Sequence, residues 1–227
     1  METIYRKQNL KICKGNNLEL MKSYEDNYFD LAIIDPPYRD EKDNSPVRGM
    51  RTNSSDKDMQ SFGDAPRIDF FNELFRVSKD QIIWGGNYFP ELWSFKVNKA
   101  NRGCKGFIFW YKENPVPNFS DGELAWTSID KVARCFYYRY YGNLEGNTSA
   151  AEKIHPTQKP VKLYEWLLKN YASKDFRILD THLGSGSSAI ASFYYGCKEF
   201  VGMEIDEGYF KKTIKRIEQQ TAQIKLL

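Results

Sequence analysis

The tetrapeptide Asp35-Pro36-Pro37-Tyr38 is the part of this 227-residue sequence that could do chemistry most directly. The two prolines fix two successive φ angles and leave the carbonyl of Pro36 as a free acceptor. Asp35 adds a carboxylate, so a rigid turn offers two hydrogen-bond acceptors with an aromatic ring beside them. Such a group suits a flat heterocycle with an exocyclic NH2, as in adenine or cytosine. An ordinary strand exit with a solvated aspartate is the alternative for this tetrapeptide alone.

A second candidate site lies nearer the end of the sequence. Residues 177–180 predict a strand, which leads into a Gly-x-Gly turn at Gly184 and Gly186 and then into a helix of small residues. Glycines let a ligand approach the backbone, and a helix N-terminus favours an anionic group. Glu204 ends the next predicted strand, 199–203, where an acid accepts hydrogen bonds from ribose hydroxyls. The glycines are too few for a dinucleotide fingerprint, so the pattern indicates a mononucleoside-like cofactor.

Two segments are candidates for contacting a larger ligand. Between residues 94 and 112 five cations occur without an acid: Lys96, Lys99, Arg102, Lys105 and Lys112. Interleaved aromatic residues would let this stretch follow a phosphate backbone, and a solvated loop is a nearly equal alternative. The polar segment 39–64 is long for a loop in a compact domain, which is typical of lids and binding loops. Surface disorder is its alternative explanation.

Apolar periodicity predicts the elements that must position these residues. Strands are expected at 9–13, 31–34, 81–84, 107–110, 131–141, 177–180 and 199–203, and helices at 18–23, 66–77, 161–172, around 189–191 and from 207 onwards. Strands alternate with helices, so the fold class is α/β with a mostly parallel sheet. Ligands bind at the carboxyl ends of the strands in such sheets, where Asp35 and the Gly-rich exit 85–89 are expected.

Composition limits the class of protein. A net charge of +3 does not by itself require a nucleic-acid partner. The four cysteines lack metal-binding spacing, which argues against a zinc site and a disulfide scaffold. The sequence shows no apolar run of membrane-span length and no signal-peptide core, so we expect a soluble cytoplasmic protein with no membrane partner. The length favours a single domain over residues 1–227.

Three motifs resemble those of the S-adenosylmethionine-dependent DNA amino-methyltransferases of the β class, whose motif order is circularly permuted. They are the segments 35–38, 155–160 and 180–186, which are similar to the family's motifs IV, X and I. The resemblance covers nearly the whole chain. It implies a Rossmann-like methyltransferase sheet that is mostly parallel with an antiparallel strand, S-adenosyl-L-methionine as cofactor, and double-stranded DNA as substrate, with no metal. By analogy with the family it also implies a homodimer in a bacterial or phage-infected cell.

The resemblance also implies roles for individual residues. Asp35, Pro36, Pro37 and Tyr38 would be catalytic, with the Asp35 carboxylate and the Pro36 carbonyl receiving the two N6 hydrogens of a flipped-out adenine and Tyr38 stacking on its ring. The cofactor would contact Asp180, His182, Gly184, Ser185, Gly186, Glu204, Thr157, Lys159 and Asn16. Aspartate at the first position of the tetrapeptide favours adenine. Cytosine-N4 methylation, RNA adenine methylation and a non-catalytic DNA-binding subunit are the alternatives.

Three features depart from the family pattern. His182 stands where the family usually has phenylalanine, and Gly15-Asn16 stands where it often has Gly-Asp. The region that would recognise the target sequence, 141–154, is very short. We therefore expect the segments 39–64 and 94–106 to contact DNA.

Overall fold

The computed structural model describes residues 3–38, 65–94, 106–113, 120–139, 154–155 and 157–222. Within these ranges nine strands form one sheet in the order β1-β2-β9-β8-β3-β4-β6-β5-β7. The strands are β1 (Thr3–Lys7), β2 (Leu10–Lys14), β3 (Phe29–Ile34), β4 (Ser78–Trp84), β5 (Phe107–Tyr111), β6 (Gly122–Thr127), β7 (Arg134–Tyr137), β8 (Arg177–Asp180) and β9 (Glu199–Glu204). Only β1 and β6 run against the others among these strands. The α/β class with a mostly parallel sheet is confirmed.

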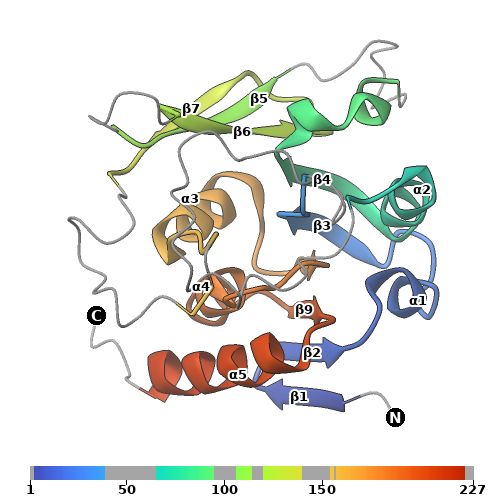
Figure 1. Cartoon of the computed structure of the whole chain (residues 1–227), viewed down its shortest axis with the longest axis vertical. Coiled ribbons are helices and arrows are strands. Elements are labelled where there is room, and N and C mark those ends of the chain that lie inside the picture. The colour runs from blue at the N-terminus through green and yellow to red at the C-terminus, as the bar shows by residue number, and fades with distance from the viewer. Residues whose placement is uncertain are drawn as a thin grey trace, which may run out of the picture.

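Helices cover both faces of the sheet (Figure 1). One face carries α1 (Asn17–Met21) and α2 (Ile68–Val77), and the other carries α3 (Val161–Tyr171), α4 (Ser187–Tyr195) and α5 (Glu207–Ala222). Side chains of β3 alternate between the two cores, since Leu31 and Ile33 pack toward α3 and α4 whereas Ala32 and Ile34 pack toward α1 and α2. Burial on both faces explains why this strand is a continuous apolar run in the sequence.

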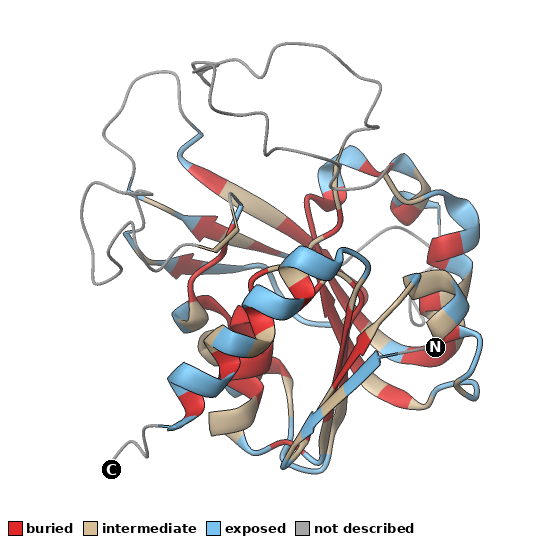
Figure 2. Cartoon of the chain, turned by 60° about the horizontal axis from the view of Figure 1, so that its bottom comes forward, coloured by how far each residue is buried: buried red, intermediate tan, exposed pale blue. Residues whose placement is uncertain are grey.

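Burial follows this three-layer arrangement (Figure 2). The central strands are buried along most of their length, whereas α5 buries one side, including Phe210 and Ile217, and exposes the other. No helix in the described part of the chain combines the length and the apolar composition that crossing a membrane requires.

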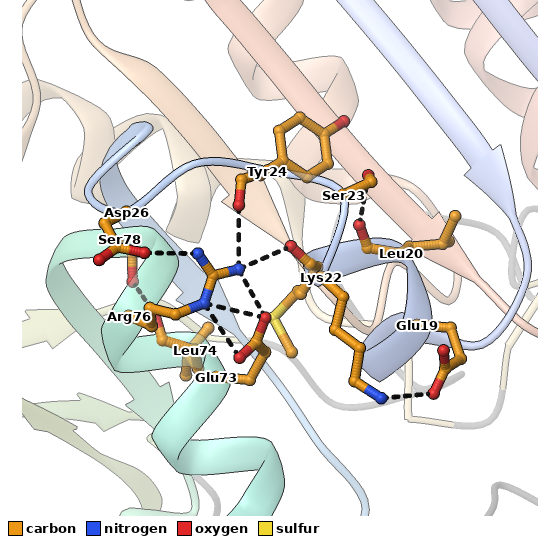
Figure 3. A network of polar contacts seen from close by, with 11 residues as sticks. Glu19, Leu20, Lys22, Ser23, Tyr24, Asp26, Glu73, Leu74, Arg76 and Ser78 are labelled. Atoms are coloured by element: carbon orange, nitrogen blue, oxygen red, sulfur yellow. Dashed lines mark hydrogen bonds and ion pairs between the residues drawn. The ribbon is translucent and has the colours of Figure 1, made fainter.

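Arg76, in the last turn of α2, fastens this helix to the loop that follows α1 (Figure 3). Its guanidinium donates to the carbonyl oxygens of Met21 and Tyr24 at 3.2 and 2.9 Å. It also pairs with the carboxylates of Glu73 and Asp26, both at 2.6 Å. Because that loop leads directly into β3, these contacts help to fix where the strand preceding Asp35 enters the sheet.

The elements in the structure differ in part from those that the sequence predicts. β1 and β6 were not predicted, and the strand expected at 131–141 is shorter, spanning Arg134–Tyr137. The Gly-rich exit after β4 forms two short 3-10 helices, Gly86–Tyr88 and Pro90–Trp93. The turn at Gly15-Asn16 caps α1, since the Asn16 side chain accepts a hydrogen bond from the Glu19 N–H at 3.1 Å.

Candidate functional site

The direction of strand order reverses between β8 and β3. The chain leaves β8 through α4 toward β9 and leaves β3 through α2 toward β4, on opposite sides of the pair. The two strands are parallel neighbours, with Leu31 opposite Ile178. Open α/β sheets bind ligands at such a reversal, outside the carboxyl ends of the strands. Asp35 follows β3 and Asp180 ends β8, so both lie at this reversal.

Asp35 is held by two other side chains. The Tyr38 hydroxyl donates to Oδ1 at 2.8 Å, and the Lys159 ammonium forms an ion pair with Oδ2. Burial and the negative charge of Asp35 raise the pKa of Tyr38, so its hydroxyl keeps the proton that it donates. The structure thus brings together the carboxylate and the ring of the tetrapeptide, and it adds a lysine from the hexapeptide.

The Gly-rich exit after β4 makes room for the Tyr38 ring. Gly85 has φ +66°, and a Cβ at this position would lie 2.1 Å from Cε1 of Tyr38. Only glycine is compatible with both the backbone conformation and the approach of the ring. Tyr88 stacks on Tyr38 with ring centroids 5.0 Å apart and an interplanar angle of 18°, while 60% of Tyr88 is exposed.

Lys159 connects Asp35 to a second carboxylate. Its Nζ lies 3.1 Å from Oε2 of Glu123, on β6, and Oε1 of Glu123 pairs with Lys112. Burial raises the pKa of Glu123, but the two lysines outweigh it and lower the value to about 2. Burial lowers the pKa of Lys159, but Asp35 and Glu123 hold it above its ordinary value. Glu123 and Lys159 are therefore both ionised at neutral pH.

Asp180 lies at the end of β8 and is only 2% exposed. One carboxylate oxygen accepts from the His182 N–H at 3.0 Å, and the other accepts from the Ser188 hydroxyl at 2.5 Å. Burial raises the pKa of Asp180 to about 7, although both hydrogen bonds favour the ionised form. Through these two hydrogen bonds the Asp180 carboxyl connects the end of β8 to the first turn of α4.

Glu204, at the end of β9, faces the Gly-x-Gly turn. The N–H groups of Gly184 and Asp206 each donate to one of its oxygens at 2.9 Å. Gly184 and Gly186 have φ +50° and +76°, which glycine adopts without strain, and a Cβ on Gly186 would lie 2.7 Å from Thr213. A carboxylate oxygen accepts more than one hydrogen bond, so Glu204 keeps acceptor capacity for a ligand beside the turn.

Two further predicted residues line the same turn. The Ser185 carbonyl accepts a hydrogen bond from Arg216 at 2.7 Å, and the side chain of Ser185 is buried. The His182 ring lies 3.1 Å from the Asn17 amide and packs edge-on against Phe70, with centroids 5.4 Å apart. Burial lowers the pKa of His182 to about 3, so the ring is neutral and packs much as an aromatic residue would.

Of the remaining predicted cofactor residues, Thr157 and Asn16 are exposed, whereas Lys159 is buried. Thr157 is exposed, with its hydroxyl 3.1 Å from Nδ1 of His155, and that ring packs on Tyr209 at 4.6 Å. The Lys159 carbonyl accepts from the Ser187 hydroxyl at 2.7 Å, which ties the hexapeptide to the first turn of α4. Asn16 is exposed beside the carboxyl end of β2.

Most of the predicted DNA-contacting residues lie outside the described residues. This holds for Lys96, Lys99, Arg102 and Lys105, for the segment 39–64 and for nearly all of 94–106 and 141–154. Lys112 is described: it pairs with Glu123 and lies over the Trp110 ring at 4.7 Å. Its contact with DNA stays a prediction.

Glu123 is the site residue that sequence reasoning did not identify. It lies on the unpredicted strand β6, opposite Trp110 of β5. The available signal is a single acid in the otherwise uncharged run 122–128. Within the described residues, no group of three His, Cys, Asp or Glu side chains is arranged to hold a metal ion.

Known proteins that are similar to this chain are methyltransferases. A family model for N6 and N4 methyltransferases, described as DNA methylase, matches residues 128–216. The type II methyltransferase M2.MboI of Moraxella bovis is 26% identical over 96% of this chain and 91% of its own length. M2.DpnII of Streptococcus pneumoniae is also 26% identical, over 95% of this chain and 92% of its own length.

Two solved structures share the fold over most of their length. The M1.HpyAVI–SAM complex aligns with a TM-score of 0.60 and 21% identity, covering 91% of this chain and 99% of that one. The cytosine-N4-specific PvuII DNA methyltransferase aligns with a TM-score of 0.63 and 14% identity, covering 96% of this chain and 92% of that one. The expected Rossmann-like sheet is therefore confirmed.

Proposed function

We propose that this chain is an S-adenosylmethionine-dependent DNA amino-methyltransferase and that it methylates N6 of adenine in double-stranded DNA. The observation that carries the proposal is the place of Asp35. Its carboxylate follows the central strand β3 at the reversal of strand order, next to the strand that leads into the Gly184–Gly186 turn. An acceptor for an amine thus lies beside a turn that suits a nucleoside cofactor.

The residues around that turn fit S-adenosyl-L-methionine. Glu204 has remaining acceptor capacity for ribose hydroxyls, and the two glycines leave the backbone of the turn open to a ligand. The hydrogen bond from Ser187 to the Lys159 carbonyl holds the hexapeptide against the same turn. When bound, the cofactor supplies an electrophilic methyl group on a sulfonium.

Asp35 and Pro36 act on the target amine. The Asp35 carboxylate and the Pro36 carbonyl accept the two N6 hydrogens of an adenine that has left the DNA stack. These bonds draw the nitrogen lone pair out of conjugation with the ring and direct it toward the methyl group. The negative charge of Asp35 then stabilises the positive charge that develops on N6 during transfer, and the methylated amine afterwards loses one of its two protons to solvent and becomes neutral. Tyr38 offers a ring on which the base stacks.

Mass spectrometry of nucleosides tests the proposal. Unmethylated duplex DNA is incubated with S-adenosylmethionine and either the wild-type protein or Asp35→Ala. We expect N6-methyladenine from the wild type and a rate at least about a hundredfold lower from the variant, because the acceptor that acts in the transition state is gone. Calorimetry should show unchanged cofactor binding by the variant.

Other outcomes overturn the proposal in distinct ways. N4-methylcytosine in place of N6-methyladenine would assign the same chemistry to the other amine. Methylation of RNA with none of duplex DNA would change the substrate, and a loss of cofactor affinity as large as the loss of rate would remove Asp35 from catalysis.

A further inference from the structure

Both carboxylate oxygens of Asp35 are already bonded in the structure. Oδ1 accepts from the Tyr38 hydroxyl and Oδ2 binds the Lys159 ammonium. An incoming amine that donates to Asp35 must therefore replace one of these donors or compete with it. The Lys159 ammonium is itself a nitrogen donor, so it occupies a position that the target amine needs.

Lys159 cannot simply be expelled from this position. Its side chain is 5% exposed, and a buried cation without a partner is strongly unfavourable. The second carboxylate within reach is Glu123, whose Oε2 lies 3.1 Å from the same Nζ. A small movement of the ammonium would exchange one anionic partner for the other.

Glu123 is placed to receive the ammonium. Its Oε2 is buried and already lies 3.1 Å from Nζ, a looser contact than the one the same ammonium makes with Oδ2 of Asp35. The ammonium is thus shared unequally between the two carboxylates. The other oxygen of Glu123 is fixed by Lys112, which lies over the Trp110 ring. The carboxylate is thus held in place with Oε2 facing the Lys159 ammonium.

We propose that Glu123 is a positioning residue that takes over the Lys159 ammonium when the target amine binds Oδ2 of Asp35. The inference rests on the proposed amine methylation. In the protein without DNA, the Lys159 ammonium occupies the position on Oδ2 of Asp35 that the amine takes later. Once the amine has entered, Glu123 keeps the lysine paired. Entry of the base then exchanges one hydrogen bond for another and leaves no buried charge unpaired.

The substitution Glu123→Gln tests this role, because it removes the charge and keeps the shape. With a neutral residue at this position the ammonium stays on Asp35 and opposes the amine. We expect the single-turnover methylation rate to fall on the order of tenfold or more. The Kd values for S-adenosylmethionine and for DNA should stay within about twofold, because base entry follows the binding of both.

The double variant Glu123→Gln/Lys159→Met gives a readout that a structural role would not produce. Removing the competing ammonium frees Asp35. At saturating S-adenosylmethionine, which offsets any loss of the predicted contact between Lys159 and the cofactor, we expect this variant to be faster than Glu123→Gln and within about tenfold of the wild type. If the single variant does not fold, the double variant, which buries no Lys159 ammonium, is compared with the wild type instead, and a rate more than about tenfold lower would contradict the inference. Glu73→Gln is the matched control: it removes a carboxylate from the Arg76 ion pairs and should lower stability without changing the rate.

Two results would overturn the inference: a Glu123→Gln rate equal to that of the wild type, or a double variant no faster than Glu123→Gln. Either leaves the proposed function intact, provided that the wild type forms N6-methyladenine. A wild type that methylates no amine overturns the proposed function itself.

Discussion

Asp180→Asn should stabilise the folded protein at neutral and alkaline pH. Asp180 is almost fully buried, and the cost of burying its charge exceeds the gain from its two hydrogen bonds. Asparagine has nearly the same shape. Its amide oxygen accepts from the His182 N–H, and its NH2 group donates to the Ser188 hydroxyl, which turns to accept. The variant therefore loses the charge and keeps both connections.

The size of the effect follows from the pKa. The carboxyl has a pKa of about 7 in the folded protein against an ordinary value of 3.8. Because the folded value is the higher one, its contribution to stability is complete below about pH 4 and is lost as the pH rises to about 7. At 1.36 kcal/mol per pKa unit, the ionised carboxylate costs the fold up to roughly 4 kcal/mol above pH 7. The neutral amide of the variant has no such cost.

Urea unfolding of both proteins between pH 4 and pH 8.5 measures this difference. The difference in the free energy of unfolding, variant minus wild type, should be close to zero at the acid end, rise with pH and level off above about pH 7. Ser188→Ala is the matched control with the opposite sign, because it removes a bond to the ionised carboxylate and so destabilises most at high pH. A variant that is less stable than the wild type at pH 8 would refute the reasoning, since the charge would then be favourable.

Two further substitutions test the packing around Tyr38 and the contacts of Arg76 with the loop after α1. Gly85→Ala should move the Tyr38 ring and lower the methylation rate at least about tenfold with unchanged cofactor Kd, because its Cβ would lie 2.1 Å from that ring. Gly196→Ala has the same left-handed backbone, with its nearest neighbouring atom 3.7 Å away, so equal rates in the two variants would contradict a specific role for Gly85. Arg76→Met should destabilise the protein by about 2 kcal/mol in urea unfolding, because two backbone carbonyls lose a charged donor. A loss below about 0.5 kcal/mol would show that water replaces the guanidinium.

The alternation of strands and helices along most of the chain and the buried strand before Asp35 could be predicted from the sequence. Leu31 to Ile34 form an apolar run ended by two prolines, and the Gly-x-Gly turn is local, so each segment carries its own signal. The strand β6 carries no such signal. Its burial depends on pairing with β4 and β5, and the β4 residues are distant from it in the sequence.

The sequence by itself determined the fold class, the tetrapeptide with its acceptors, and the glycines of the turn, because these depend on backbone geometry and on local periodicity. The tertiary structure alone decided which charges meet. Lys159 stands 124 positions after Asp35 in the chain and 36 after Glu123, yet its ammonium lies between their carboxylates. Such contacts depend on strand order and on burial of the ammonium, which raises the interaction of charges far above its value in water. No spacing in the sequence encodes that proximity.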